Sequence, residues 1–263
     1  MEFAIPYALA SVIAVSLISL IGAAALLFRP RILERGMFLL VSLAVGALFG
    51  DAIIHLIPES FKELSSITAS AIILLGVIAF FALEKFLHWH HEHGHGAEEH
   101  HEEEPDIIEP GLKPRIKPLG YLILISDGIH NFIDGVLIGA SFLVSIEVGI
   151  ATTIAIVLHE IPHELSDFAL LIHAGFSRAK ALFMNFLSAL TAVLGTISVF
   201  ALEPAGETIV PLMVAFGAGS FLYIAGSDLV PELHKTSNVK HTLLQFLALL
   251  IGIGIMFLLL FLE

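Results

Sequence analysis

Long apolar segments, separated by short polar or charged stretches, recur along almost the whole chain. A membrane-spanning helix needs roughly 20 mostly apolar residues, because each residue advances the helix by about 1.5 Å. Hydrophobic residues make up 57% of the 263 positions and charged residues only 14%, a balance unusual for water-soluble domains. The sequence therefore predicts an all-α integral membrane protein with eight transmembrane helices. The expected spans are 4–27, 37–58, 67–87, 118–144, 147–172, 179–202, 208–232 and 241–262.

Lysine and arginine residues are divided unevenly between the two sides of this predicted bundle. Only Lys62 is left for one side, whereas the other side holds nearly all the rest. Because loops rich in Lys and Arg stay in the cytoplasm, both chain termini are expected outside it. The four loops expected to be cytoplasmic are 28–36, 88–117, 173–180 and 233–240.

Composition excludes two kinds of chemistry. The chain has no cysteine, so it can form neither disulfides nor thiolate metal sites. Any transition metal must be held by His, Asp, Glu or Asn. The net charge of −13 comes largely from acidic residues at 92–109 and near helix ends, and no basic stripe with interleaved aromatic residues is present. Nucleic acid is therefore not an expected partner.

Two polar clusters interrupt the fourth and fifth predicted spans. Residues 127–135 read Asp-Gly-Ile-His-Asn-Phe-Ile-Asp-Gly, and residues 159–164 read His-Glu-Ile-Pro-His-Glu, followed by Asp167. An ionisable side chain at the bilayer centre costs about 2.5–3.5 kcal/mol on insertion scales. Several ionisable side chains at this depth therefore indicate a functional site. The alternative is a buried hydrogen-bonded network that joins the helices.

The spacing in each cluster predicts a metal site. His130 and Asp134 are four residues apart, as are His159 and His163, so each pair lies on one helix face. The two helices run antiparallel, and His130 and His159 each lie about 18 Å from opposite surfaces, so the pairs should meet near the midplane. Imidazole and carboxylate ligands in this number suit Zn²⁺. Since a ligating imidazole must be neutral, metal affinity should fall as pH drops through roughly 6.

Three neighbouring residues add to this prediction. Asn131 and Glu160 directly follow His130 and His159, and they could hold a second ion nearby. Pro162 removes a backbone donor and should kink or break its helix. Such an interruption is tolerated at membrane depth only where the backbone lines a polar cavity or is buried in protein.

A faint repeat on the second and seventh spans suggests a path to and from the site. The second span ends His55-Leu-Ile-Pro-Glu59, and the seventh ends Asp228-Leu-Val-Pro-Glu232. In the predicted topology one segment lies at the outer face and the other at the inner face, as an inverted repeat requires. For both glutamates the alternative is ordinary solvation at a helix end. The expected pathway residues are Asp51, His55 and Glu59 on the outer side, and Asp167, Asp228 and Glu232 on the inner side.

The loop at 88–117 is rich in His and Glu, a composition typical of disorder. It could buffer or sense cytosolic metal with low affinity, or it could be only a polar tether. Its candidate ligands are His88, His90, His91, His93, His95, His100 and His101.

At the midplane clusters the sequence resembles the ZIP (Zrt/Irt-like) family of metal-ion transporters, in the branch whose fifth helix reads His-Glu-x-Pro-His-Glu. The segments 130–135 and 159–164 carry this resemblance. It implies uptake into the cytosol of a divalent cation, Zn²⁺ above all, with Fe²⁺, Mn²⁺ and Cd²⁺ as further candidates. It also implies two groups of ligands: a primary site of His130, Asp134, His159 and His163, and a secondary site at Asn131 and Glu160.

The same resemblance implies the arrangement of the whole chain. Residues 1–263 should form one transmembrane domain, with helices arranged 3+2+3 as an inverted repeat. We expect a homodimer in the plasma membrane. Some family members complete the secondary site with a glutamate on the sixth helix, where this chain offers only Asn185 and Ser188.

The main alternative is an intramembrane zinc metalloprotease. His159-Glu160-Ile161-Pro162-His163 fits the pattern His-Glu-x-x-His, in which Glu160 would act on zinc-bound water and Asp134 would be a third ligand. Against it, Pro162 should break the helix that holds both imidazoles, and a hydrolase does not need polar residues on the second and seventh spans. A metal exporter would share the ligands, because ligands do not encode direction.

Overall fold

The computed structural model describes residues 4–21, 30–93, 118–202, 206–235 and 238–262. Within these ranges all regular secondary structure is helical, which confirms the predicted all-α class. The elements in chain order are α1 (Ala4–Ile18), α3 (Pro30–Asp51), η1 (Ala52–Leu56), α4 (Ile57–Glu63), α5 (Ser66–His93), α6 (Pro118–Val144), α7 (Ile146–His173), α8 (Arg178–Ala189), α9 (Thr191–Ala201), α10 (Gly206–Tyr223), η3 (Ile224–Leu229), α11 (Val230–Leu233), α12 (Val239–Leu259) and η4 (Leu260–Leu262).

Six helical segments of the described residues are long and apolar enough to cross a membrane. Helix α7 has 28 residues but is not among them, since the polar residues of its second half lower its hydropathy. Helix α1 has 15 residues, and residues 22–27 of the first predicted span lie outside the described ranges. The count of eight spans therefore remains a prediction. The six segments are Met37–Glu63, Ser66–Lys85, Gly120–Val144, Arg178–Ala201, Ile209–Leu233 and Val239–Leu259.

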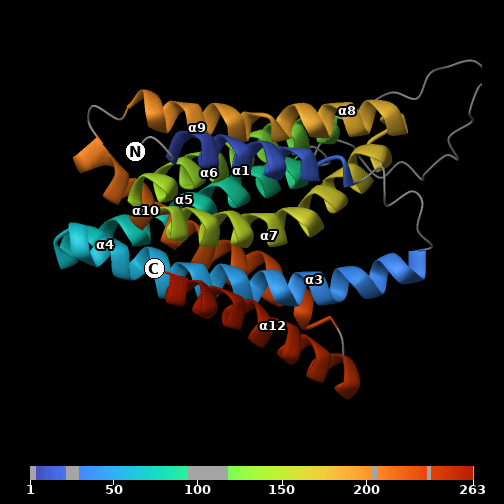
Figure 1. The fold of residues 1–263 in the computed structure, drawn as a ribbon. Helices are drawn as coiled ribbons and strands as arrows, with labels where there is room; N and C mark the ends of the chain where they lie inside the picture. The colour runs from blue at the N-terminus through green and yellow to red at the C-terminus, as the bar shows by residue number, and fades with distance from the viewer. Residues whose placement is uncertain (1–3, 22–29, 94–117, 203–205, 236–237, 263) are drawn as a thin grey trace, which may run out of the picture.

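The long helices lie side by side in two groups (Figure 1). In one group α3 packs along α12 and α5 packs along α10; in the other, α6 packs against α9, α7 and α1. The groups meet chiefly where α3 contacts α7 and α10 contacts α6. Both marked chain ends lie toward the same end of the bundle (Figure 1).

Glycines let the helix backbones touch within each group. A Cβ on Gly135 of α6 would overlap the carbonyl oxygen of Ala192 in α9, and a Cβ on Gly195 of α9 would overlap that of Phe132 in α6. Small residues at membrane helix contacts permit this close approach. The same reciprocal pattern joins α3 to α12 through Gly46 and Gly252, and α5 to α10 through Gly76 and Gly219.

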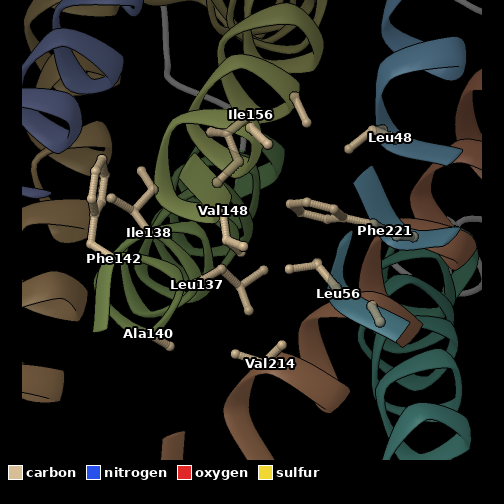
Figure 2. Packing of buried hydrophobic residues seen from close by; sticks show 14 of the residues in the cluster. Leu48, Leu56, Leu137, Ile138, Ala140, Phe142, Val148, Ile156, Val214 and Phe221 are labelled. Carbon is tan, nitrogen blue, oxygen red and sulfur yellow. The ribbon is translucent and has the colours of Figure 1, made fainter. Parts of the chain in front are cut away.

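Large apolar side chains fill the space between the two groups (Figure 2). Phe221 of α10 is fully buried and points toward Leu137 of α6 and Ile156 of α7. Leu48 of α3 and Leu56 of η1 lie beside it and are also buried. The main core thus consists of side chains that meet across the groups.

A π-helical turn precedes the Pro-Glu pair in both segments of the predicted repeat. The turn η1 comes just before Pro58 at the start of α4, and η3 comes just before Pro231 at the start of α11. Proline has no N–H to donate, and a local π turn is one adjustment that restores the backbone hydrogen bonds in a membrane helix. The two segments therefore share a backbone feature as well as a sequence pattern.

Two helices extend beyond what the sequence predicts. Helix α7 is continuous from Ile146 to His173 with Pro162 inside it, so the prediction that Pro162 breaks this helix is wrong. Helix α5 continues to His93, past the expected end of its span at residue 87, and includes the positions of His88, His90 and His91. Residues 94–117, with His95, His100 and His101, lie outside the described ranges.

Candidate metal site

Four ligand-bearing side chains from α6 and α7 converge in the interior. His130 and Asp134 come from α6, and His159 and Glu160 come from α7; one ligand atom from each lies within 4.8 Å of the others. Nε2 of His159 is 3.2 Å from Oδ2 of Asp134, and Nε2 of His130 is 3.2 Å from Oε1 of Glu160. The two Nε2 atoms are 3.3 Å apart. All four residues are buried. We refer to them as the first group.

The backbone of α7 orients one of these imidazoles. Nδ1 of His159 donates a hydrogen bond to the carbonyl of Ala155, at 3.1 Å. Because a carbonyl only accepts, Nδ1 carries the proton and Nε2 presents its lone pair to the group. Fixing the tautomer through the second ring nitrogen is the usual way that proteins prepare a metal-binding histidine.

Among the described residues, the carboxylates of the first group face the two imidazoles and no other donor. Both oxygens of Asp134 and both oxygens of Glu160 are buried without a hydrogen-bond partner among the described residues. A buried carboxylate is costly unless it is paired or binds a metal. Two carboxylates facing two imidazole nitrogens therefore form a site whose chemistry suits a divalent cation.

A second group lies beside the first. Asp127 of α6 and His163 and Asp167 of α7 each offer a ligand atom within 4.8 Å of the others. The His163 ring is stacked on the His130 ring with centroids 4.8 Å apart. Nδ1 of His163 is 3.5 Å from Oδ2 of Asp167. We call these three residues the second group.

The structure thus distributes the six predicted ligands differently from the family pattern. Glu160 joins His130, Asp134 and His159, whereas His163 belongs to the second group. Nδ2 of Asn131 donates to Oδ1 of Asp127 at 2.7 Å.

The outer pathway residues belong to neither group. Asp51 is fully buried and accepts a hydrogen bond from Thr152. Nε2 of His55 donates to the carbonyl of Met256 at 3.0 Å. Glu59 pairs with Lys62 at 2.8 Å.

A cavity of ≈ 260 Å³ opens on the side of the second group. His130, His163 and Asp167 line it from one helix group, and Glu84, Tyr223 and Asp228 line it from the other. The hydroxyl of Tyr223 donates to Glu84. Glu232 lies outside this lining and pairs with Lys235.

Three residues near the site were not assigned from sequence. Glu84 is the acidic residue of the mostly apolar third predicted span, and this could have identified it. Asp127 begins the fourth-span cluster, three residues before His130. Tyr223 gives no signal in the sequence, because its role depends on the packing of α10 against α5.

Asn185 and Ser188 of the sixth predicted span bind carboxylates of neighbouring helices. Asn185 of α8 donates to Oε2 of Glu164 at 2.5 Å, and Ser188 donates to Asp127.

Comparison with known proteins identifies the family. The model of the ZIP zinc transporter family matches residues 3–260. The metal cation symporter ZIP14 of Xenopus tropicalis is 35% identical over 318 aligned positions, which cover 96% of this chain and 68% of the relative. Zinc transporter ZIP13 of Danio rerio is 36% identical over 84% of this chain and 75% of its own length. Human zinc transporter ZIP4 is 33% identical, and the match covers 79% of this chain and 40% of the relative.

These relatives are named as transporters and not as enzymes, so the protease alternative has no support. The helix-breaking argument against that alternative does not hold, since α7 is continuous, but the comparisons lead to the same conclusion. The family match spans nearly the whole chain, including both polar clusters. This chain belongs to the ZIP zinc transporter family.

Proposed function

We propose that this chain carries a divalent transition-metal cation, zinc first of all, across a membrane through the first group. The observation that supports this most is the set of four orphaned oxygens on Asp134 and Glu160, buried beside two imidazoles. The names of the relatives, zinc transporters and a metal cation symporter, agree with it. A single divalent cation would neutralise both carboxylates.

The ligand set also limits the cargo. Two imidazole nitrogens and two carboxylate oxygens suit tetrahedral Zn²⁺, and the same donors accept Fe²⁺, Mn²⁺ or Cd²⁺. The geometry favours Glu160 over His163 as the fourth ligand, because only Glu160 shares the cluster with His130, Asp134 and His159. His163 and Asn131 remain available beside it.

The proposed path runs through polar residues on both sides of the site. Glu59, His55 and Asp51 would receive the ion from outside. The cavity that contains Asp167 and Asp228 supports an exit toward the end of the bundle where α5 ends and α6 begins, and Glu232 would lie beyond it. A path of this kind needs sites that bind strongly enough to dehydrate the ion and weakly enough to release it.

Orientation and assembly complete the proposal. Basic loops at the end that bears the exit cavity favour transport into the cytosol, with both termini outside. A homodimer in the plasma membrane, an eight-helix 3+2+3 arrangement and weak metal binding by the His-rich loop follow from the family pattern.

The deciding experiment is uptake of radioactive zinc into liposomes that contain the purified protein. His159→Ala and Asp134→Ala should each reduce the flux to near background, since each removes one of four ligands. His173→Ala is the matched control: it removes an exposed histidine from the same helix and should retain flux. Undiminished flux in both ligand variants would remove the proposed site.

A further inference from the structure

We propose that the groove between α6 and the α8–α9 pair binds an acyl chain of an anionic phospholipid, whose headgroup lies against Lys180. This inference goes beyond the proposed function and does not depend on it, because it requires only that these helices lie in a membrane. Helices α8 and α9 run along one edge of the bundle (Figure 1). The groove has a volume of ≈ 570 Å³, within the range of about 300–1,000 Å³ that is typical of ligand sites.

One face of α6 forms a wall of the groove. Tyr121, Ile125 and Phe132 line it and are four or seven residues apart, so they share that helix face. Gly128 lies between them and leaves a hollow, since a Cβ there would meet no atom closer than 3.7 Å. The opposite wall comes from α8 and α9 and includes Met184, Leu187 and Leu194.

The hydroxyl groups in the groove already have partners. Ser188 donates to Asp127, and Thr191 donates to the carbonyl of Gly128 at 2.6 Å. The other lining side chains are apolar except for that of Tyr121 at one end. The groove therefore suits an alkyl chain and offers little to a polar ligand.

The length of the groove matches one leaflet of a bilayer. Tyr121 and Phe132 are eleven residues apart along α6, which corresponds to about 16 Å at roughly 1.5 Å per residue. The hydrocarbon core of a bilayer is about 30 Å thick, so one leaflet is roughly 15 Å deep. Tyr121 is the second residue of the candidate span Gly120–Val144, and Phe132 lies at the middle of that span. An acyl chain in the groove would therefore reach from the membrane surface to the midplane.

A basic side chain lies at the surface end of the groove. Lys180 precedes Met184 by four residues, so both lie on the same face of α8. Nζ of Lys180 is 5.0 Å from the centroid of the Phe176 ring, and that ring is 5.8 Å from the ring of Tyr121. These contacts connect Lys180 to the lining. Among the described residues no acidic side chain forms an ion pair with Lys180, so its charge is available to a ligand.

Charge favours an anionic lipid as the occupant. Basic side chains at the membrane surface attract anionic headgroups, and Arg178, exposed at the start of α8, adds to the charge of Lys180. A second copy of the chain fits less well. A two-fold axis along the membrane normal would bring the same basic side chains of both copies to one end of the interface, where they repel each other.

The test is native mass spectrometry of the full chain in detergent, titrated with phosphatidylglycerol or with phosphatidylcholine of the same acyl chains. Wild type should bind the first phosphatidylglycerol about fivefold or more tightly than the first phosphatidylcholine, the factor expected for one basic side chain at the surface. Lys180→Gln should weaken phosphatidylglycerol binding by about this factor and leave phosphatidylcholine binding unchanged. Lys240→Gln is the matched control, because it removes an exposed lysine at the start of α12 and should retain the preference.

Leu187→Trp should fill part of the groove and weaken the binding of both lipids. Ile197→Trp is its matched control, because both residues are 49% exposed and Ile197 is outside the lining. Elution as a single species shows that each variant is folded. A phosphatidylglycerol with a photoreactive group at the end of one acyl chain locates the site, since it should label the chain near Phe132 and Leu194.

Three results would overturn the proposal. Equal binding of the two lipids to wild type would remove the headgroup site. Unchanged binding in both Lys180→Gln and Leu187→Trp would show that lipid binds elsewhere. A wild-type dimer that Leu187→Trp dissociates, with lipid binding unchanged, would assign the groove to a second copy of the chain.

Discussion

Thr152 of α7 donates a hydrogen bond to Asp51 at the end of α3, with 3.0 Å between Oγ1 and Oδ2. Both side chains are fully buried, and Oδ1 of Asp51 has no partner among the described residues. This bond joins the two helix groups. The hydroxyl of Thr152 thus stabilises the buried carboxylate of Asp51.

Thr152→Val should destabilise the protein, because valine keeps the shape of the side chain and removes its donor. Leaving a buried acceptor unsatisfied costs about 1–3 kcal/mol, and more for charged groups. The melting temperature in detergent should fall. Thr152→Ser, which retains the hydroxyl, should lose much less. A valine variant as stable as wild type would show that Asp51 does not depend on this bond.

Gly135→Ala should prevent α6 and α9 from packing, since its Cβ would overlap the carbonyl oxygen of Ala192. Overpacking of this kind typically costs about 1–3 kcal/mol, and a clash with backbone leaves little room to relax. Gly254→Ala is the matched control, because a Cβ there meets nothing within 4 Å. It should be neutral or stabilising by up to about 1 kcal/mol through helix propensity. Thermal unfolding measures this: the melting temperature should fall for Gly135→Ala and should stay the same or rise for Gly254→Ala.

Phe221→Ala should open a void between the helix groups. Phe221 is 0% exposed, and its ring centroid is 6.1 Å from that of His159. Truncating a buried phenylalanine costs about 3–5 kcal/mol. Phe183→Ala, on a side chain that is 62% exposed, should cost far less in the same denaturation experiment. Equal losses would contradict a central packing role for Phe221.

Metal binding should strengthen as pH rises from about 5 to 8, because free imidazole titrates near pH 6.5 and a ligating imidazole must be neutral. Protons and metal compete for His130 and His159, so each bound ion should release protons into a weakly buffered solution. Calorimetric titrations in buffers of different ionisation enthalpy count those protons. An affinity independent of pH in this range would exclude histidine ligands.

Deletion of residues 94–117 should leave the maximal zinc flux unchanged, because the ligands of the first group lie on α6 and α7. The response of the flux to prior metal loading is what the deletion should alter. Liposome uptake with and without internal zinc checks both points. Loss of all flux on deletion would show that the loop belongs to the path itself.

The fold class could be predicted because apolar segments of this length have few alternatives to helices in lipid. Local boundaries were harder. Helix α5 continues to His93 through polar residues, which hydropathy alone reads as loop. Helix α7 stays helical across Pro162, because the packing of α1, α3 and α6 supports it on several sides.

For the site, a spacing of four residues predicts that His130 and Asp134 lie together, as they do in the structure, but it cannot choose between Glu160 and His163 as partners of His159. In the structure Glu160 is buried and His163 is only half-buried, a difference that depends on the rotation of α7 against α6. Rotation is a tertiary property. The cavity residues Glu84 and Tyr223 depend in the same way on the packing of α5 against α10.

The buried carboxylate oxygens of Asp134 and Glu160, which lack hydrogen-bond partners among the described residues, should affect how stable the protein is in a cell. If the proposed site binds the transported ion, that ion also stabilises the folded protein, and the lifetime of the protein should depend on the supply of metal. By mass action, free zinc at a hundredfold excess over its dissociation constant would add about 2.7 kcal/mol of stability. Depletion of zinc would then lower the amount of this protein in the cell, because the metal-free form is less stable and is degraded faster.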